Sequence, residues 1–178
     1  MHIYLIRHPQ PDIPPGACYG QTDLALRKPP HMLAHTLQQQ LPAGIPVFSS
    51  PLLRCRALAE AITASSNTLP VYDHRLQEMH FGEWEMQTWS DIPRQQLDAW
   101  AADPLHYTPP GGESVAQVRQ RVHAFLADHT NTHRAIIMIT HAGVMKVICG
   151  AQQQLPLSKW MSLSFDYGVI HSVDWGNV

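Results

Sequence analysis

The chain carries little charge of either sign. Lys, Arg, Asp and Glu make up 15% of its 178 residues, and the formal net charge at pH 7 is −2. A protein of this composition has no overall positive field with which to hold nucleic acid or an anionic membrane. An anionic ligand must therefore be bound by a local cluster of basic residues, and we expect the partner to be a small molecule.

Long apolar runs are missing as well. The chain begins MHIYLIRHPQ, where Arg7 and His8 interrupt a short apolar run. A signal peptide has a basic start and a longer apolar core, and no other segment approaches the length that crosses a bilayer. We therefore expect a cytoplasmic protein without a membrane segment.

The cysteine and histidine patterns of disulfide scaffolds and metal sites are also absent. Cys18, Cys55 and Cys149 are odd in number and widely spaced, without a CxxC pair. This spacing suggests neither a disulfide framework nor a zinc knuckle, so buried or partly buried free thiols are expected. The twelve histidines form no HExxH or HxH motif, and no metal site or other cofactor is predicted.

Short apolar segments alternate along the chain with segments of helical periodicity. Strands are expected at 2–6, 45–49, 69–72 and 135–139, with one or two more in 164–175, and helices at 30–41, 49–62, 92–104, 111–129 and 142–148. This alternation predicts an α/β fold with three layers, in which helices cover both faces of a mostly parallel central sheet. The length fits one domain, 1–178, with 79–112 as a loop and helix insert over the active site.

Polar residues of similar chemistry follow three of the expected strands: Arg7-His8, Ser49-Ser50 with Arg54 shortly after, and Thr140-His141. Ligands of open α/β sheets bind outside the carboxyl ends of the strands, so these residues should converge. Each of them alone has an ordinary structural explanation. Together, two arginines, two histidines and a helix N-terminus are typical of a phosphate site.

Such a set of residues suits phosphoryl transfer through histidine. The reaction needs a neutral imidazole, cations on the transferring oxygens and an acid for the leaving oxygen. His8 can serve as nucleophile, Arg7 and Arg54 as clamps, and His141 as a hydrogen-bond donor to the transferring group. The acid is left open among three carboxylates of one segment, Glu78, Glu83 and Glu85.

Five motifs in order carry a family resemblance: LIRH, SSPLLRCRALAEAI, LQEMHFGEWE, GGES and ITHAGVMKV. Over most of its length the chain resembles the histidine phosphatase (phosphoglycerate-mutase-like) superfamily. The resemblance implies a metal-independent phosphatase with a phosphohistidine intermediate and a phosphoglycerate-mutase-like fold. It matches Arg7, His8, Arg54 and His141 to the family's phosphate pocket. Glu78 matches the usual proton donor, and Glu83 is the second choice.

Within the superfamily, GACYGQTDLAL and LQEMHFGEWE are most similar to α-ribazole phosphatases, which act on α-ribazole 5′-phosphate in cobalamin biosynthesis. The alternatives are a broad-specificity phosphatase, a fructose-bisphosphatase-like or mutase-like member, and a non-catalytic phosphoryl-binding module. The oligomeric state is not readable from the sequence. The insert brings four aromatic residues that either stack on a substrate base or pack internally: Trp84, Trp89, Trp100 and Tyr107.

Two positions depart from the family pattern. Pro9 replaces the glycine of the common RHG motif, and Pro14 stands where many members carry asparagine. The phosphate hydrogen bond that this asparagine would make is expected either to be missing or to be supplied by Gln21 or Thr22. The full set of expected substrate-binding residues is Arg7, Gln21, Thr22, Arg54, Glu83, His141 and Ala142.

Overall fold

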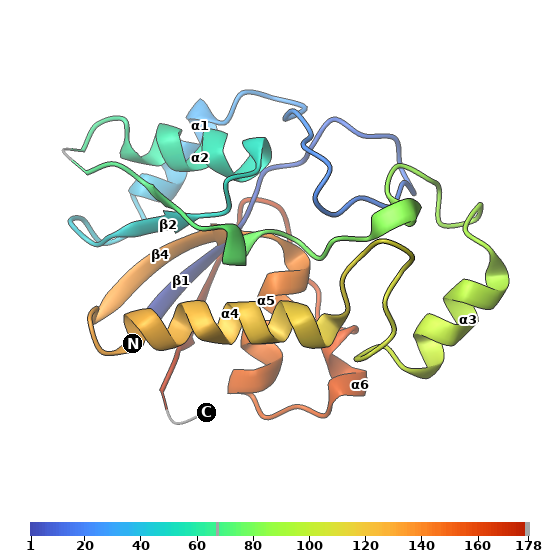
Figure 1. The fold of residues 1–178 in the computed structure, drawn as a ribbon. Coiled ribbons are helices and arrows are strands. Elements are labelled where there is room, and N and C mark those ends of the chain that lie inside the picture. Colours follow the sequence, from blue (N-terminus) through green and yellow to red (C-terminus); the bar gives the residue numbers. More distant parts are fainter. Residues whose placement is uncertain (67, 177–178) are drawn as a thin grey trace.

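A five-stranded sheet forms the centre of the protein in the computed structural model, which describes residues 1–66 and 68–176 (Figure 1). Its strands are β1 (His2–Arg7), β2 (Val47–Ser49), β3 (Val71–Tyr72), β4 (Ala135–Thr140) and β5 (Ile170–Asp174). Their order is β3-β2-β4-β1-β5, and β5 is the one antiparallel strand among them. The predicted mostly parallel sheet is confirmed.

Helices cover both faces of this sheet, as predicted. Side chains of β1 alternate between the two faces, so that Ile6 packs toward α1 (His31–Gln38) and α2 (Leu53–Thr63). Ile3 and Leu5 pack on the other face, toward α4 (Val115–Thr130) and α5 (Ala142–Gln152). In Figure 1, α1 and α2 lie above the sheet and α4 and α5 below it. The remaining helical segments are η1 (His74–Leu76), η2 (Gly82–Trp84), α3 (Arg94–Ala102) and α6 (Leu157–Trp160).

Several element boundaries differ from the expected ones. The helix expected from residue 49 begins at Leu53, because the backbone N–H of Ser50 still donates to Ile139 of the sheet and Leu52 is extended. The strand expected at 69–72 is reduced to β3, an exposed edge strand. In the tail there is one strand, β5, since residues 164–169 form a loop.

The register of the sheet places three strand ends together. Arg7, at the end of β1, is paired with Thr140 at the end of β4, and Ser49 of β2 is paired with Ile139. The residues that follow these strands therefore meet at one edge of the sheet. Figure 1 shows the segment 79–112, with α3, projecting beyond the sheet.

The sequence also gave expectations about the burial of the cysteines and about the length of apolar helices. The three cysteines, Cys18, Cys55 and Cys149, are buried free thiols, as predicted. No helix in the described part of the chain is both long and apolar enough to cross a membrane.

Candidate active site

Two histidines and an arginine meet at the carboxyl edge of the sheet. His8 follows β1, His141 follows β4, and the centres of their rings lie 5.0 Å apart. Arg54 comes from the first turn of α2, and all three side chains are at most 1% exposed. The Nε2 atom of His141 lies 2.8 Å from the hydroxyl oxygen of Ser50, which follows β2. Residues from three separate strand ends thus form one buried polar cluster.

The backbone determines which nitrogen of His8 is free. Its Nδ1 atom lies 2.7 Å from the carbonyl oxygen of Pro9. A carbonyl oxygen can only accept a hydrogen bond, so Nδ1 carries the proton and Nε2 carries the lone pair. His8 is therefore held in the tautomer that a nucleophilic Nε2 requires.

Burial keeps both imidazoles neutral. It lowers the pKa of His8 to about 3, helped by the positive charges of Arg54 and Arg7, although the bond to Pro9 acts in the opposite direction. Burial, followed by the charge of Arg54, also holds the pKa of His141 well below its usual value. At neutral pH neither ring carries a charge that would remove its lone pair.

Each of the two arginines keeps a hydrogen-bond donor free. Arg54 donates from its terminal nitrogens to the carbonyl oxygens of Gly20 and Thr22, and Arg7 donates to that of Phe165. The Nε atoms of both arginines are buried without a partner. A buried donor without an acceptor costs about 1–3 kcal/mol.

The three candidate acids have different surroundings. Glu78 lines the cavity next to His8, and its two oxygens accept from the N–H groups of Met79, at 2.9 Å, and Gly143, at 3.0 Å. Glu83 is exposed and does not line this cavity. Of the two carboxylates that the family pattern offers as proton donor, Glu78 and Glu83, it is Glu78 that lies where a leaving group would be.

Glu85 is used for structure. Its carboxylate accepts from the backbone N–H groups of Gln21, Thr22 and Phe81, and from the Thr22 hydroxyl. Burial acts to raise the pKa of Glu85, but the bonds from Thr22 and these N–H groups hold it below its usual range. An ionised carboxylate with all these donors ties the loop around residue 20 to the insert.

A network missed by sequence reasoning fixes the backbone of Glu78. Arg121 of α4 donates to the carbonyl oxygens of Arg75, Gln77 and Glu78. The same guanidinium is paired with both carboxylate oxygens of Glu113, at 2.7 and 3.0 Å. The GGES motif contains Glu113, but nothing in the sequence links it to Arg121, eight residues later.

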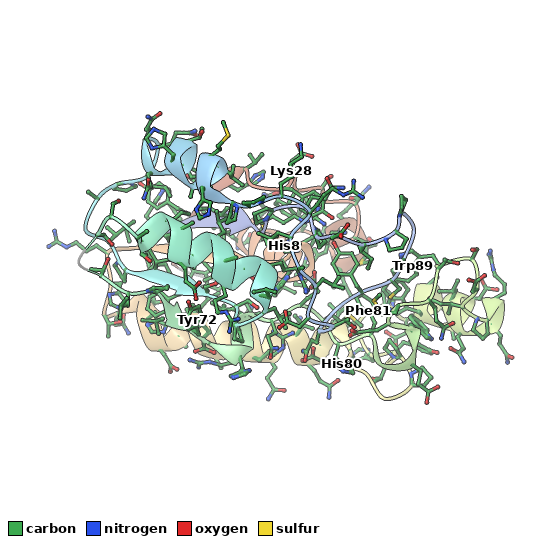
Figure 2. All side chains as sticks on the ribbon, turned by 90° about the horizontal axis from the view of Figure 1, so that it is seen from above. His8, Lys28, Tyr72, His80, Phe81 and Trp89 are labelled. Carbon is green, nitrogen blue, oxygen red and sulfur yellow. The ribbon has the colours of Figure 1, made fainter. Side chains whose placement is uncertain are left out.

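A cavity of about 260 Å³ opens beside the cluster, and Phe81, Trp89 and Trp100 form one part of its wall. Trp89 and Trp100 lie parallel, with ring centres 5.8 Å apart, and Phe81 meets both edge-on. Figure 2 shows Phe81 and Trp89 on the side of His8 that faces α3. Trp84 and Tyr107 do not line the cavity but stack on each other behind it. Two of the four expected aromatic residues therefore line the cavity, and two pack internally.

Of the other residues that were expected to contact substrate, some line the cavity and some do not. Ala142, the first residue of α5, lines the cavity. Gln21 and Thr22 do not, because the amide of Gln21 donates to the carbonyl oxygen of Glu78 and the Thr22 hydroxyl to Glu85. Pro14, at the family's asparagine position, is exposed. The replacement of this asparagine by Gln21 or Thr22 stays a prediction.

Three residues near the arginines and the cavity were not predicted to belong to the site. Tyr19 and Lys146 line the cavity, and the Tyr167 ring lies 3.7 Å from the guanidinium carbon of Arg7. Tyr19 lies within GACYGQTDLAL and Lys146 within ITHAGVMKV, whereas Tyr167 lies outside the quoted motifs. Only the fold brings the three residues to the site.

Comparison with known proteins identifies the family of the chain. A model of the histidine phosphatase superfamily (branch 1) matches residues 3–177. The chain is 27% identical to phosphoserine phosphatase 1 of Hydrogenobacter thermophilus, over 99% of this chain and 89% of that protein. It is also 27% identical to the adenosylcobalamin/alpha-ribazole phosphatase of Escherichia coli, over 98% and 90%. The crystal structure of the alpha-ribazole phosphatase from Shigella flexneri superimposes with a TM-score of 0.84 at 26% identity, covering 99% of this chain and 91% of that one. The chain belongs to the histidine phosphatase superfamily.

Proposed function

We propose that the protein is a phosphomonoesterase that acts through a phosphohistidine at His8, and that its substrate is α-ribazole 5′-phosphate. The observation that carries the first part is the free Nε2 of a buried, neutral imidazole beside two arginines. Each arginine has a buried Nε donor without a partner. Arginines bind phosphate through charge-assisted hydrogen bonds, and a neutral imidazole beside them is free to attack phosphorus.

In the first step, the Nε2 lone pair of His8 attacks phosphorus. The bond from phosphorus to the ester oxygen breaks, and Glu78 gives its proton to the leaving oxygen. The Nδ1–H bond to the Pro9 carbonyl stabilises the positive charge that the ring gains. Arg7 and Arg54 bind the remaining phosphate oxygens as charge redistributes among them.

In the second step, water attacks phosphorus and gives a proton to the Glu78 carboxylate. The bond between phosphorus and Nε2 breaks, which returns the electron pair to His8 and releases inorganic phosphate. Glu78 is protonated again and ready for the next ester. The residues of this chain thus supply nucleophile, acid, base and cationic clamp.

The cavity wall supports an ester whose alcohol carries a flat, apolar base. Phe81, Trp89 and Trp100 offer aromatic surface beside the phosphate cluster, and stacking of a base on such a surface is worth about 1–3 kcal/mol. A broad-specificity phosphatase is the second candidate. The equal identity to a phosphoserine phosphatase and to an α-ribazole phosphatase favours keeping it.

The test measures phosphate release from α-ribazole 5′-phosphate and from phosphoserine, 3-phosphoglycerate and p-nitrophenyl phosphate, with EDTA present. We expect the highest kcat/KM for α-ribazole 5′-phosphate. Similar values for all four esters would keep the phosphatase and reject the substrate. No release from any of them would reject the enzyme and favour a phosphoryl-binding module.

Variants of the aromatic wall distinguish binding of the substrate's base from binding of its phosphate. Trp89→Ala should lower kcat/KM for α-ribazole 5′-phosphate by about 10-fold, the lower part of the range for one stacked base, and change that for phosphoserine less than twofold. Gln95→Ala, on the exposed surface of α3, is the matched control. An equal loss on both esters in Trp89→Ala would contradict a base-binding role.

A further inference from the structure

Two tyrosines from distant loops meet above the phosphate-binding arginines. Tyr19 follows β1 and Tyr167 precedes β5, and their hydroxyl oxygens lie 2.9 Å apart. The guanidinium carbon of Arg7 lies 3.7 Å from the centre of the Tyr167 ring, and that of Arg54 lies 5.3 Å from the Tyr19 ring. Each arginine is thus covered by one tyrosine, and the two tyrosines are joined to each other.

The loop that carries Tyr167 also holds Arg7 by its backbone. Arg7 donates from a terminal nitrogen to the carbonyl oxygen of Phe165, at 2.8 Å, and its own carbonyl oxygen accepts from the N–H of Gly168, at 2.9 Å. Gly168 has a φ of +68°, and a Cβ there would meet Leu33 at 2.6 Å. The positive φ favours glycine in this turn, and the two hydrogen bonds tie the loop of Tyr167 to Arg7.

The loop that carries Tyr19 holds Arg54 in the same manner. The terminal nitrogens of Arg54 donate to the carbonyl oxygens of Gly20 and Thr22, on either side of residue 21. Gly20 cannot take a side chain, because a Cβ would lie 2.0 Å from the carbonyl oxygen of Met79. Each guanidinium is therefore bound at its terminal nitrogens by carbonyl oxygens and on its face by a ring.

We propose that Tyr19 and Tyr167 are positioning residues that clamp the two arginines, so that both guanidinium groups stay in the orientation that binds phosphate. The inference rests on the proposed function, because it assigns these arginines to phosphate. Ring and carbonyl oxygens together leave each planar guanidinium little freedom to rotate. The bond between the two hydroxyl groups also connects the two loops.

The experiment measures the competitive inhibition constant of inorganic phosphate, with kcat and KM for p-nitrophenyl phosphate. Tyr167→Leu removes the ring, and Tyr167→Phe keeps the ring and removes the hydroxyl. Tyr72→Leu is the matched control, since Tyr72 is 39% exposed against 36% for Tyr167, its hydroxyl is also paired, and it lies on the edge strand β3. Figure 2 shows Tyr72 on the opposite side of His8 from Trp89.

We expect the inhibition constant of phosphate to rise about 10-fold in Tyr167→Leu, within the range of a partly buried cation–π contact. KM should rise with it, more than kcat falls. In Tyr167→Phe the phosphate inhibition constant and KM should both stay within about threefold of the parent values. Tyr72→Leu should match the parent. An aromatic rescue of this kind would not follow from a merely structural role of Tyr167.

The outcomes separate the clamp from the function on which it rests. Weak or absent phosphate inhibition of the parent enzyme would overturn the proposed function. Normal inhibition of the parent with an unchanged constant in Tyr167→Leu would overturn the clamp alone, as would an equal loss in the Phe and Leu variants. Should Tyr167→Leu fail to fold, Tyr167→Met keeps the bulk without the π face and must show the same 10-fold weakening.

Discussion

A single methyl group at Gly143 should displace the proton donor of this site. Gly143 is the second residue of α5, and its N–H donates to Glu78. A Cβ at this position would lie 2.1 Å from the Oε1 atom of Glu78, whereas ordinary contacts begin at 3.4 Å. The carboxylate of a Gly143→Ala variant must therefore move by at least 1.3 Å, the difference between these two distances.

The change should affect catalysis and not folding. Alanine is favoured over glycine inside a helix by about 1 kcal/mol, so the Tm should stay equal or rise. A misplacement of about 1 Å in a reacting group costs on the order of 100-fold in rate. We expect kcat for an alkyl phosphate such as glycerol phosphate to fall by about 30- to 100-fold.

The assay compares this alkyl ester with p-nitrophenyl phosphate. The nitrophenolate needs little protonation as it leaves, so its kcat should fall by less than about fivefold. Glu78→Gln should give the same pattern, and the double variant Glu78→Gln/Gly143→Ala should lose little more than Glu78→Gln alone. Full alkyl phosphatase activity in Gly143→Ala, or additive losses in the double variant, would refute the assignment of Glu78.

Four further predictions follow, two for His8, one for Arg54 and one for the turn at Gly82. His8→Ala should form no acid-labile, base-stable phosphoenzyme while keeping its circular dichroism spectrum; full turnover in this variant would reject the mechanism. The folded-state pKa of His8 is lowered to about 3 from 6.5, so its contribution to stability is complete above pH 6.5 and is lost as the pH falls toward 3. Urea titrations should show the parent losing up to about 1.4 kcal/mol per pH unit more than His8→Ala in this window; parallel curves would contradict the shift. Arg54→Lys keeps the charge but loses the fork to Gly20 and Thr22, and the phosphate inhibition constant should rise at least about 10-fold; an unchanged constant would show that charge alone suffices. Gly82→Ala places a Cβ 2.0 Å from the Pro110 carbonyl oxygen at a φ of +57°, and denaturation should show a loss of about 2 kcal/mol or more; an unchanged midpoint would contradict this.

Local patterns determined most of the fold. Strand and helix periodicities are properties of consecutive residues, and the short apolar runs at 2–6 and 135–139 correspond to β1 and β4. Where proline or an edge position intervened, the periodicity was less informative. The apolar run before Tyr72 gave only the short strand β3, because a strand with one neighbour has fewer partners to extend it.

The same local patterns placed the centre of the site. Parallel strands end at one edge of a sheet, so residues that follow different strands meet there whatever their separation in sequence. This rule predicted that His8 and His141 lie close together, and the centres of their rings are 5.0 Å apart. The preference for Glu78 came from the family pattern, and its bond to the N-terminal turn of α5 supports that preference.

Tertiary structure alone decided the rest. It placed Glu78 in the cavity and left Glu83 exposed, although the two are five residues apart in one motif. It brought Tyr19 and Tyr167 together across 148 residues. A sequence records which groups can bind or transfer a proton. Their distances and burial, and hence their pKa values and free donors, depend on loops that the packing of the whole chain holds in place.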